Sequence, residues 1–307
     1  MKIYINSAKE NWVVDRFIDE WNKFNFKQSK NFRFGDKIVW LIAPWTWRKI
    51  PKKYLIKNKV VCTIHHIDED KFKSNEEIEF KDRDKFVDYY HVISNKTFDQ
   101  VIKLTDKPVH KIPFWVNQNL WFEIKNKEQL REKYSVDLNS YLVGSFQRDT
   151  EGYDLVSPKL SKGPDRFLEI VEYLNTKNEN LQIILTGKRR NYILDELSRR
   201  EINYKYFEMT SFQNLNELYN ILDLYIVSSR YEGGPQSILE TAMTRTPIIS
   251  TDVGIASEIL DKKSIFNMNN YKDAIPNTDI SYQNAKRYLI PEGFKEFNKL
   301  FREIYES

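Results

Sequence analysis

Residues 225–254 read YIVSSRYEGGPQSILETAMTRTPIISTDVG, and this stretch decides the fold. It opens in a short apolar, β-branched run at residues 224–227, which is typical of a buried parallel strand. A glycine-glycine-proline turn at residues 233–235 then interrupts the run. Gly234 suits the N-cap of a helix, and Pro235 suits its first position, where the missing N–H is not needed. The stretch therefore predicts a strand, a tight turn and a helix.

The predicted helix has one apolar face and a defined end. Its apolar residues recur at helical spacing, at Ile238, Leu239, Ala242 and Met243. Pro247 disfavours the helical conformation in the residue before it, so the helix is expected to end near Arg245, and a second strand follows. At the other end, the amides of Gln236 and Ser237, together with the positive end of the helix dipole, predict an anion site.

Two carboxylates flank this anion site. Glu232 precedes the helix, and Glu240 lies just over one turn inside it. Carboxylates repel a phosphate but accept hydrogen bonds from hydroxyl groups. A nucleotide sugar carries hydroxyls on both sides of its diphosphate, on the ribose and on the transferred sugar, so the layout fits such a ligand. The plainer interpretation, a helix-terminal carboxylate and a solvated one, stays open at this point.

The spacing of Glu232 and Glu240 resembles the E-x7-E region of retaining GT-B glycosyltransferases of glycosyltransferase family 4. LETAMTRTPIIS follows the helix-then-strand pattern of that family, with Arg245 where a glycine is common. The resemblance implies an α/β protein with two doubly wound, Rossmann-like domains that face each other across a cleft. It also implies retaining, metal-independent transfer from a nucleotide diphosphate sugar, UDP- or GDP-linked, to a hydroxyl of a glycan or glycolipid. No cofactor is expected. The resemblance also assigns Gly233 and Gly234 to donor binding.

Strands and helices alternate along the chain, which predicts α/β architecture independently of the resemblance. Strands are expected at residues 2–6, 37–42, 59–64, 91–94, 109–114, 141–146, 181–186, 204–207, 224–228 and 247–250. Helices are expected at residues 12–24, 97–104, 163–175, 192–200 and 215–222, and after Gly234. We divide the chain into an acceptor-binding domain at 1–138, a donor-binding domain at 139–290 and a terminal helix at 291–307 that returns to the first domain.

Other candidate donor residues also follow strands of the second half. Gln147-Arg148 comes after the strand at 141–146, and Lys162 lies in SKGPD, which resembles the E-K-G-x-D of the family. The resemblance implies that Arg148 and Lys162 hold the donor diphosphate, and cations there would meet the charge of the leaving group. Gly187 and Lys188 follow the next strand, where glycine permits close approach of a ligand. Two solvated surface cations are the alternative.

One histidine of the first half is a candidate at the reacting sugar. Thr63-Ile64-His65 resembles the T-x-H that the family has at a strand end, and His66 occupies the usual Asp position. The resemblance assigns the role near the sugar to His65, although which of the two histidines faces the sugar stays open. A structural histidine with satisfied hydrogen bonds is an equally good interpretation.

Composition limits the class of protein. With 307 residues, of which 41% are hydrophobic, and a mean hydropathy of −0.62, the chain can fill two domain cores. It has no apolar run of the length of a membrane span, and its first residues predict a strand rather than a signal peptide. The lone Cys62 excludes a disulfide framework and favours the cytoplasm.

The basic residues are unevenly distributed. Residues 1–138 carry 27 Lys and Arg against 20 Asp and Glu, and the net charge of the chain is +4. Within residues 45–59, six bases follow Trp45 and Trp47 without an intervening acid. Bases mixed with aromatic residues indicate an anionic ligand or a peripheral contact with the inner face of a membrane, and an ordinary solvated face is equally compatible.

Two other functions stay open beside sugar transfer. A nucleotide-sugar epimerase of the same fold would need no acceptor, and a non-catalytic carbohydrate-binding protein would keep only the shell of the fold. The acids at 68–70 and 82–84 match D-x-D, a pattern expected by chance in a chain with this many Asp, so no metal site is assigned. Nucleic acid is not an expected partner.

Overall fold

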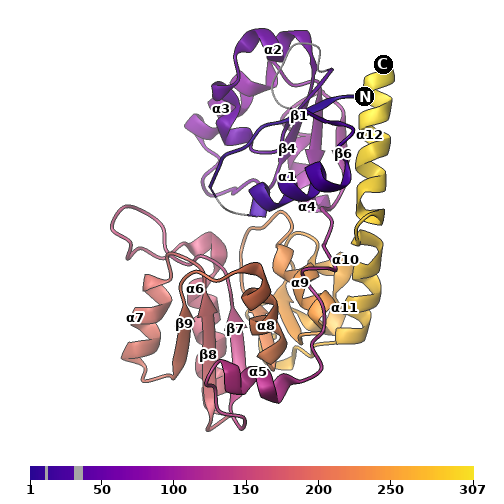
Figure 1. Ribbon diagram of the computed structural model, residues 1–307. Helices are drawn as coiled ribbons and strands as arrows, with labels where there is room; N and C mark the ends of the chain where they lie inside the picture. Colours follow the sequence, from indigo (N-terminus) through magenta and orange to yellow (C-terminus); the bar gives the residue numbers. More distant parts are fainter. Residues whose placement is uncertain (11–12, 31–36) are drawn as a thin grey trace. The chain divides into compact units, whose positions relative to one another are not determined.

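The computed structural model of this protein describes residues 1–10, 13–30 and 37–307 (Figure 1). The chain forms two compact units, one of residues 1–114 with 291–307 and one of residues 115–290. Each unit contains one six-stranded sheet in which every described pair of strands is parallel. The α/β prediction is confirmed. The expected first residue of the first helix, Trp12, lies outside the described residues.

The sheet of the first unit has the order β2-β1-β3-β4-β5-β6. Its strands are β1 (Ile3–Ile5), β2 (Ser29–Lys30), β3 (Ile38–Leu41), β4 (Lys59–Ile64), β5 (Tyr89–Val92) and β6 (Val109–Lys111). Its α-helices are α1 (Val13–Phe24), α2 (Lys52–Lys57), α3 (Ser74–Asp84), α4 (Asn95–Val101) and α12 (Lys295–Glu306). The order reverses between β1 and β3, so a topological switch point lies between these two strands.

The terminal helix α12 is part of the first unit because its apolar stripe is aromatic. Phe297 and Phe301 are fully buried and lie 5.4 and 5.0 Å from the ring of Trp40 on β3. Trp21 of α1 meets the same rings edge-on. Burial of each Phe side chain contributes roughly 1.5–3 kcal/mol, which is enough to hold a helix far from this unit in sequence.

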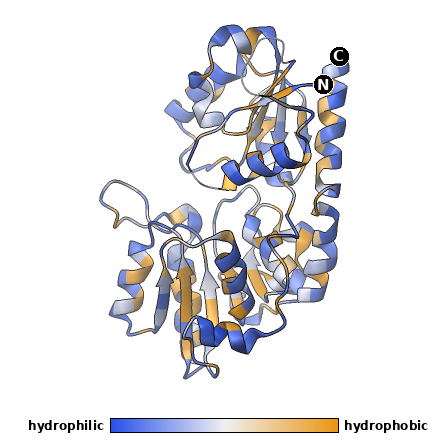
Figure 2. Cartoon of the chain, viewed as in Figure 1, coloured by the Kyte–Doolittle hydropathy of each residue, from blue (hydrophilic) through white to orange (hydrophobic). Residues whose placement is uncertain are grey.

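The sheet of the second unit has the order β12-β11-β10-β7-β8-β9. Its strands are β7 (Tyr141–Ser145), β8 (Leu181–Thr186), β9 (Tyr204–Phe207), β10 (Leu224–Val227), β11 (Ile248–Thr251) and β12 (Ile265–Phe266). Its α-helices are α5 (Lys127–Lys133), α6 (Pro164–Asn175), α7 (Asn191–Arg199), α8 (Phe212–Ile221), α9 (Gln236–Thr244), α10 (Ala256–Ile259) and α11 (Thr278–Ala285). Hydrophobic residues of its central strands and of the helices beside them form its core, and Figure 2 colours hydrophobic stretches on strands and hydrophilic stretches on the surrounding helices.

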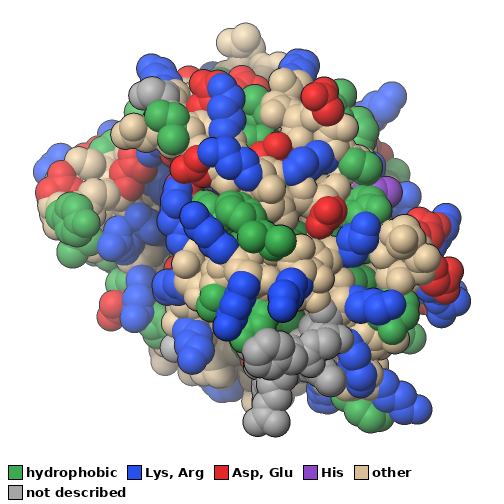
Figure 3. All heavy atoms as spheres, turned by 90° about the horizontal axis from the view of Figure 1, so that it is seen from above, with side chains coloured by type: hydrophobic (Ala, Val, Ile, Leu, Met, Phe, Trp, Pro, Cys, Tyr) green, Lys and Arg blue, Asp and Glu red, His purple; other side chains and the backbone are tan. Residues whose placement is uncertain are grey.

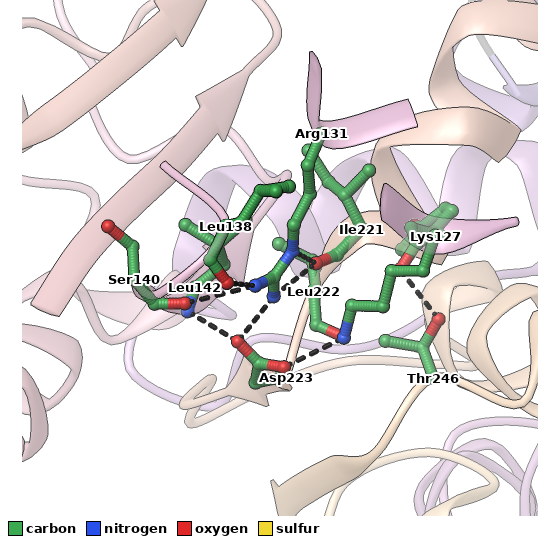
Figure 4. Close-up of polar contacts among 10 residues, drawn as sticks. Lys127, Arg131, Leu138, Ser140, Leu142, Ile221, Leu222, Asp223 and Thr246 are labelled. Carbon is green, nitrogen blue, oxygen red and sulfur yellow. Dashed lines mark hydrogen bonds and ion pairs between the residues drawn. The ribbon is translucent and has the colours of Figure 1, made fainter. Parts of the chain in front are cut away.

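Residues 115–138 group with the second unit, so the division falls earlier than the sequence-based boundary after residue 138. The cause is a buried ion-pair cluster on α5 (Figure 4). Arg131 is 6% exposed and donates to Asp223 at 2.6 Å and to the carbonyl of Ile221 at 3.0 Å. Lys127 donates to the other oxygen of Asp223 at 2.7 Å. Asp223 in turn accepts the amide of Leu142, which fixes α5 to the start of β7.

Several boundaries differ from prediction, and two of them have a clear local reason. β5 begins at Tyr89 rather than at residue 91, because Tyr89 pairs in register with Val61 of β4. α9 begins at Gln236, with Pro235 rather than Gly234 at the N-cap. Pro235 has ψ 116°, which is outside the helical range, so it does not form the first turn. At the other end, Arg245 takes the left-handed conformation, with φ 54°, that a glycine would adopt more easily.

Candidate functional site

The second sheet has its own topological switch point, between β7 and β10. β7, β8 and β9 run outward in one direction and β10, β11 and β12 in the other. In open α/β sheets, ligands bind beyond the carboxyl ends of the strands where this reversal leaves a crevice. The loops in this place are the one after β7, which carries Gln147 and Arg148, and the one after β10, which carries Glu232.

Lys162 and Glu232 lie together at this point. Lys162 Nζ and Glu232 Oε1 form an ion pair, with the two side chains 20% and 11% exposed. The turn that carries Lys162 is pressed against the end of β10, where the Ser228 hydroxyl donates to the carbonyl of Gly163 at 2.8 Å. Gly163 has φ 62°, and a side chain there would collide with the backbone of Ser228. The glycine of SKGPD is therefore what brings Lys162 to Glu232.

Gln147 joins the same group, although the sequence interpretation gave it no role. Its Nε2 donates to the carbonyl of Lys162 at 2.8 Å. Its Oε1 accepts from the hydroxyl of Ser229 at 3.1 Å, and that hydroxyl also lies 3.1 Å from Glu232. The ends of β7 and β10 and the turn before α6 are thus joined by one hydrogen-bond network. The sequence feature that could have pointed to Gln147 and Ser229 is their position, because each comes shortly after the end of a strand.

Arg148 lies in the loop after β7 and is half-buried. Its Nε donates to the carbonyl of Thr150 at 2.8 Å, so part of the guanidinium holds its own loop. Burial lowers the pKa of Arg148, with the nearby Arg189 adding to the effect. Gly187 has φ 91° and accepts a hydrogen bond from Tyr206, while Lys188 is exposed. Arg148 and Lys188 are therefore cations at the carboxyl ends of β7 and β8.

The start of α9 is half-buried and close-packed. Gln236 and Ser237 form its first turn, where the amides of any α-helix have no acceptor inside the helix. Gly254, in the second glycine turn, has φ 57°, and a Cβ there would lie 2.6 Å from the carbonyl of Gly233. Gly234 is half-buried beside it. The two glycine turns therefore pack on each other beside the start of the helix.

Glu240 is more deeply placed than a surface carboxylate. It is 5% exposed and accepts a hydrogen bond from the hydroxyl of Tyr219 at 2.9 Å. Burial, and then the charge of Glu240, raises the pKa of Tyr219 well above its usual range. Tyr219, Tyr225 and Phe146 pack with ring centroids about 5 Å apart, and Ser237 hydrogen-bonds Tyr225. Glu240 thus belongs to a buried polar cluster directly behind the first turn of α9.

The predicted histidine site lies in the first unit, after β4. His65 is half-buried, and its Nε2 lies 2.7 Å from the carbonyl of Ile42. Because a carbonyl only accepts, the neutral ring carries its proton on Nε2 and keeps Nδ1 as an acceptor. Burial lowers the pKa of His65 to about 4. The ring lies 5.9 Å from both Trp45 and Phe114, whereas His66 is exposed.

Asn6 closes the switch point of the first sheet. Its Nδ2 donates to the carbonyl of Ala43 at 2.8 Å and to the hydroxyl of Thr46 at 2.8 Å. Its Oδ1 accepts the amide of Ala43 at 3.0 Å. These bonds bridge the ends of β1 and β3, so the side chain of an asparagine shapes the turn.

Comparison with known proteins identifies the architecture. The family described as glycosyl transferases group 1 matches residues 157–275, the part that contains Lys162, Glu232 and Glu240. Anabaena HepE, solved with UDP and glucose, superposes with a TM-score of 0.76 at 12% identity over 99% of this chain and 100% of that chain. Sucrose-phosphate synthase from Thermosynechococcus elongatus gives a TM-score of 0.68 at 13% identity, over 95% of this chain and 78% of that chain.

The chain has the GT-B fold. Within it, residues 157–275 are similar to the family described as glycosyl transferases group 1. Mannosylfructose-phosphate synthase of Agrobacterium fabrum is 24% identical over 156 residues, which is 48% of this chain. The match spans 33% of the length of that relative.

Two features are absent from the part of the chain that the structure describes. In residues 1–10, 13–30 and 37–307, no group of three or more His, Cys, Asp or Glu is arranged to hold a metal ion. No helix in these ranges combines the length and the apolar character needed to span a membrane.

Proposed function

We propose that this GT-B protein is a retaining glycosyltransferase that moves a sugar from a nucleotide diphosphate sugar to a hydroxyl of a glycan or glycolipid, without a metal ion. The observation that carries the proposal is the grouping of Lys162, Glu232 and the start of α9 at the switch point of the second sheet. A cation and a helix N-terminus suit a diphosphate, and carboxylates on either side suit hydroxyl groups.

In this proposal the donor diphosphate lies at the first turn of α9. The amides of Gln236 and Ser237, with Lys162 and Arg148, stabilise the charge that develops on the leaving nucleotide. Lys162 must then exchange part of its contact with Glu232 for the phosphate, which leaves the Glu232 carboxylate to accept hydroxyls of the transferred sugar. Uridine diphosphate is the first nucleotide to test, because HepE was solved with UDP and with UDP-glucose.

Glu240 is proposed to bind the ribose hydroxyls, and its burial favours this role. A carboxylate shielded from water and fixed by Tyr219 makes stronger hydrogen bonds than an exposed one. Gly187 and Lys188, after β8, are proposed to border the nucleotide. No step needs a nucleophilic side chain, and none is assigned to Glu232.

His65 is proposed to contact the transferred sugar through Nδ1. The Nε2 proton is held by the carbonyl of Ile42, and the low pKa keeps the ring neutral in the physiological range. A neutral imidazole with a fixed tautomer can accept a hydrogen bond from a sugar hydroxyl.

Substitution of the two residues in the central ion pair tests the assignment. Glu232→Gln and Lys162→Ala are each expected to lower transfer at least about a hundredfold, because each removes charge complementarity at the reacting group. Glu169→Gln and Lys177→Ala change carboxylate and ammonium groups of α6 and the loop after it and serve as matched controls. Unchanged transfer in either site variant, with a folded protein, would refute the site.

The reaction products distinguish sugar transfer from the epimerase alternative. Incubation with donor alone, followed by NMR, yields a modified nucleotide sugar if the protein is an epimerase and leaves the donor intact if an acceptor is required. With an acceptor, the coupling constant of the anomeric proton reports retention. A product of inverted configuration would contradict the retaining mechanism and leave the transferase activity standing.

A further inference from the structure

The basic stretch at residues 45–59 is divided by the fold into two surfaces. Trp47 is buried, at 2% exposed, and its Nε1 donates to Glu79 at 2.5 Å. Trp45 is half-exposed, and its Nε1 donates to Glu10 at 3.1 Å. Trp45 follows the carboxyl end of β3, whereas α2 leads back to the amino end of β4. The aromatic residues therefore do not share a surface with the lysines at the end of α2, and the predicted patch needs correction.

A row of lysines follows the amino ends of the strands instead. Lys2 and Lys37 immediately precede β1 and β3, and Lys59 opens β4. β1, β3 and β4 are neighbours in the sheet. Because adjacent strands are about 4.8 Å apart, the three residues span about 10 Å along one end of the sheet. Lys57, the last residue of α2, and Lys53 in the turn before it extend the row.

Both ends of this row carry an exposed apolar side chain. Lys2 donates to the carbonyl of Lys27 at 2.9 Å, so the loop after α1 lies beside β1. In that loop Phe26 is 67% exposed, and in α2 Ile56 is 72% exposed. Figure 3 shows this face, where Lys and Arg side chains gather around exposed hydrophobic groups. We call Lys2, Lys27, Lys37, Lys53, Lys57 and Lys59 the lysine row.

The charge of the row is only partly compensated. No Asp or Glu occurs between residues 37 and 67. Asp88, at the start of β5, accepts the amide of Val60 at 2.7 Å, and Glu306 ends α12 next to Tyr305, whose ring lies 4.5 Å from the ammonium of Lys37. These two acids thus accompany six lysines among the described residues, and Asp36, which precedes Lys37 in the sequence, lies outside them. Arg48 does not contribute, since it is paired with Glu79 and Asp82.

We propose that the lysine row binds the surface of an anionic bilayer, with Phe26 and Ile56 entering the headgroup region. Lysines that approach an anionic leaflet, combined with apolar side chains that insert, are the two contributions by which peripheral proteins bind. His65 follows β4 at the opposite end of the same sheet, so a bilayer on the lysine row leaves the predicted acceptor side of this unit uncovered. The inference does not depend on the proposed sugar transfer.

Vesicle co-sedimentation of the full chain, without nucleotide sugar, tests the surface. Binding is expected to phosphatidylcholine vesicles that contain phosphatidylglycerol and not to phosphatidylcholine alone, and to weaken with added salt. The triple variant Lys53→Glu, Lys57→Glu, Lys59→Glu is expected to lower the partition coefficient at least about tenfold. Phe26→Ser with Ile56→Ser is expected to reduce binding while its salt dependence remains.

The control places the same change of charge on the second unit. Lys177→Glu, Lys262→Glu, Lys263→Glu alters three exposed lysines there and should bind vesicles like the wild type. Circular dichroism checks that both triple variants are folded. Equal loss of vesicle binding in the two triple variants would show that net charge alone determines the binding, and would overturn the proposal. Absence of vesicle binding by the wild type would overturn it as well. Tighter, lysine-dependent binding to duplex DNA or RNA than to vesicles would assign the row to nucleic acid instead.

Discussion

Three histidines of the first unit, His65, His91 and His110, have lowered pKa values, and burial is the main cause for all three. The pKa of His65 is lowered to about 4 and that of His91 to about 3. His91 is fully buried, with Nδ1 2.9 Å from the hydroxyl of Thr63 and Nε2 2.7 Å from the carbonyl of Ile112. It joins β4, β5 and the loop after β6, so its role is structural. Of His65 and His91, only His65 retains an acceptor nitrogen for a ligand.

Burial of neutral His91 predicts acid sensitivity. In the unfolded chain its pKa returns to about 6.5, so below that pH the unfolded state binds a proton that the native state does not. The stability that neutral His91 contributes to the folded state is complete above about pH 6.5 and is lost as the pH falls toward about 3. Between pH 6.5 and 5 it amounts to about 2 kcal/mol.

Urea unfolding at pH 7 and pH 5 measures this pH-dependent contribution of His91 to the free energy of unfolding. His91→Gln is expected to be less stable than the wild type at pH 7 and to lose less stability on acidification. The exposed His66 provides the control, since His66→Gln should keep the wild-type loss. If His91→Gln and wild type lost the same stability between the two pH values, His91 would not be the buried neutral group described here.

At the scale of the elements, a buried ion pair and several hydrogen bonds hold the loop after β7 in place. Arg190, which is 1% exposed, forms an ion pair with Asp149 at 2.5 Å and donates to the carbonyls of Ser145 and Gln147. The amides of Asp149 and Thr150 donate to the carbonyl of Arg189. This clamp joins the loops after β7 and β8 and fixes the backbone on either side of Arg148.

Loss of one partner of the clamp should be costly. Asp149→Asn leaves the buried guanidinium without its counter-charge, which costs about 3 kcal/mol. The matched control is Glu77→Gln, in an exposed pair with Lys81, where we expect less than about 1 kcal/mol. Urea unfolding of the two variants gives the comparison. Similar midpoints for both would show that the clamp does not stabilise the loop.

The sequence predicted elements well where periodicity and breakers agreed. β4 and β8 have the predicted bounds, and the strand–turn–helix of the opening stretch is present with a one-residue shift. α3 was missed because SNEEIEFKDRD is almost entirely polar and buries little beyond Phe80 and Arg83. α5 was missed for the same reason, with Leu130 as its one apolar residue. Such helices are held by tertiary contacts, which local patterns do not encode.

At the scale of the molecule, alternation of strands and helices was enough to predict two α/β units. The division between them was less predictable, because residues 115–138 are joined to the second unit by Arg131 and Asp223, far apart in sequence. Contacts between residues far apart in sequence also limited the prediction of the candidate site. Lys162 and Glu232 were found from motifs, whereas Gln147 and Ser229 became visible only once the ends of β7 and β10 were adjacent.

The central claim is that the switch point of the second sheet binds a nucleoside diphosphate. Isothermal titration calorimetry with UDP, then with GDP, CDP and ADP, tests it in wild type, Lys162→Ala and Lys177→Ala. We predict that one of these nucleotides binds the wild type and Lys177→Ala equally. Loss of a charge-assisted contact, about 1.5–3 kcal/mol, should weaken its binding to Lys162→Ala at least about tenfold. Absence of binding by all four, or equal affinity in Lys162→Ala, would contradict the account.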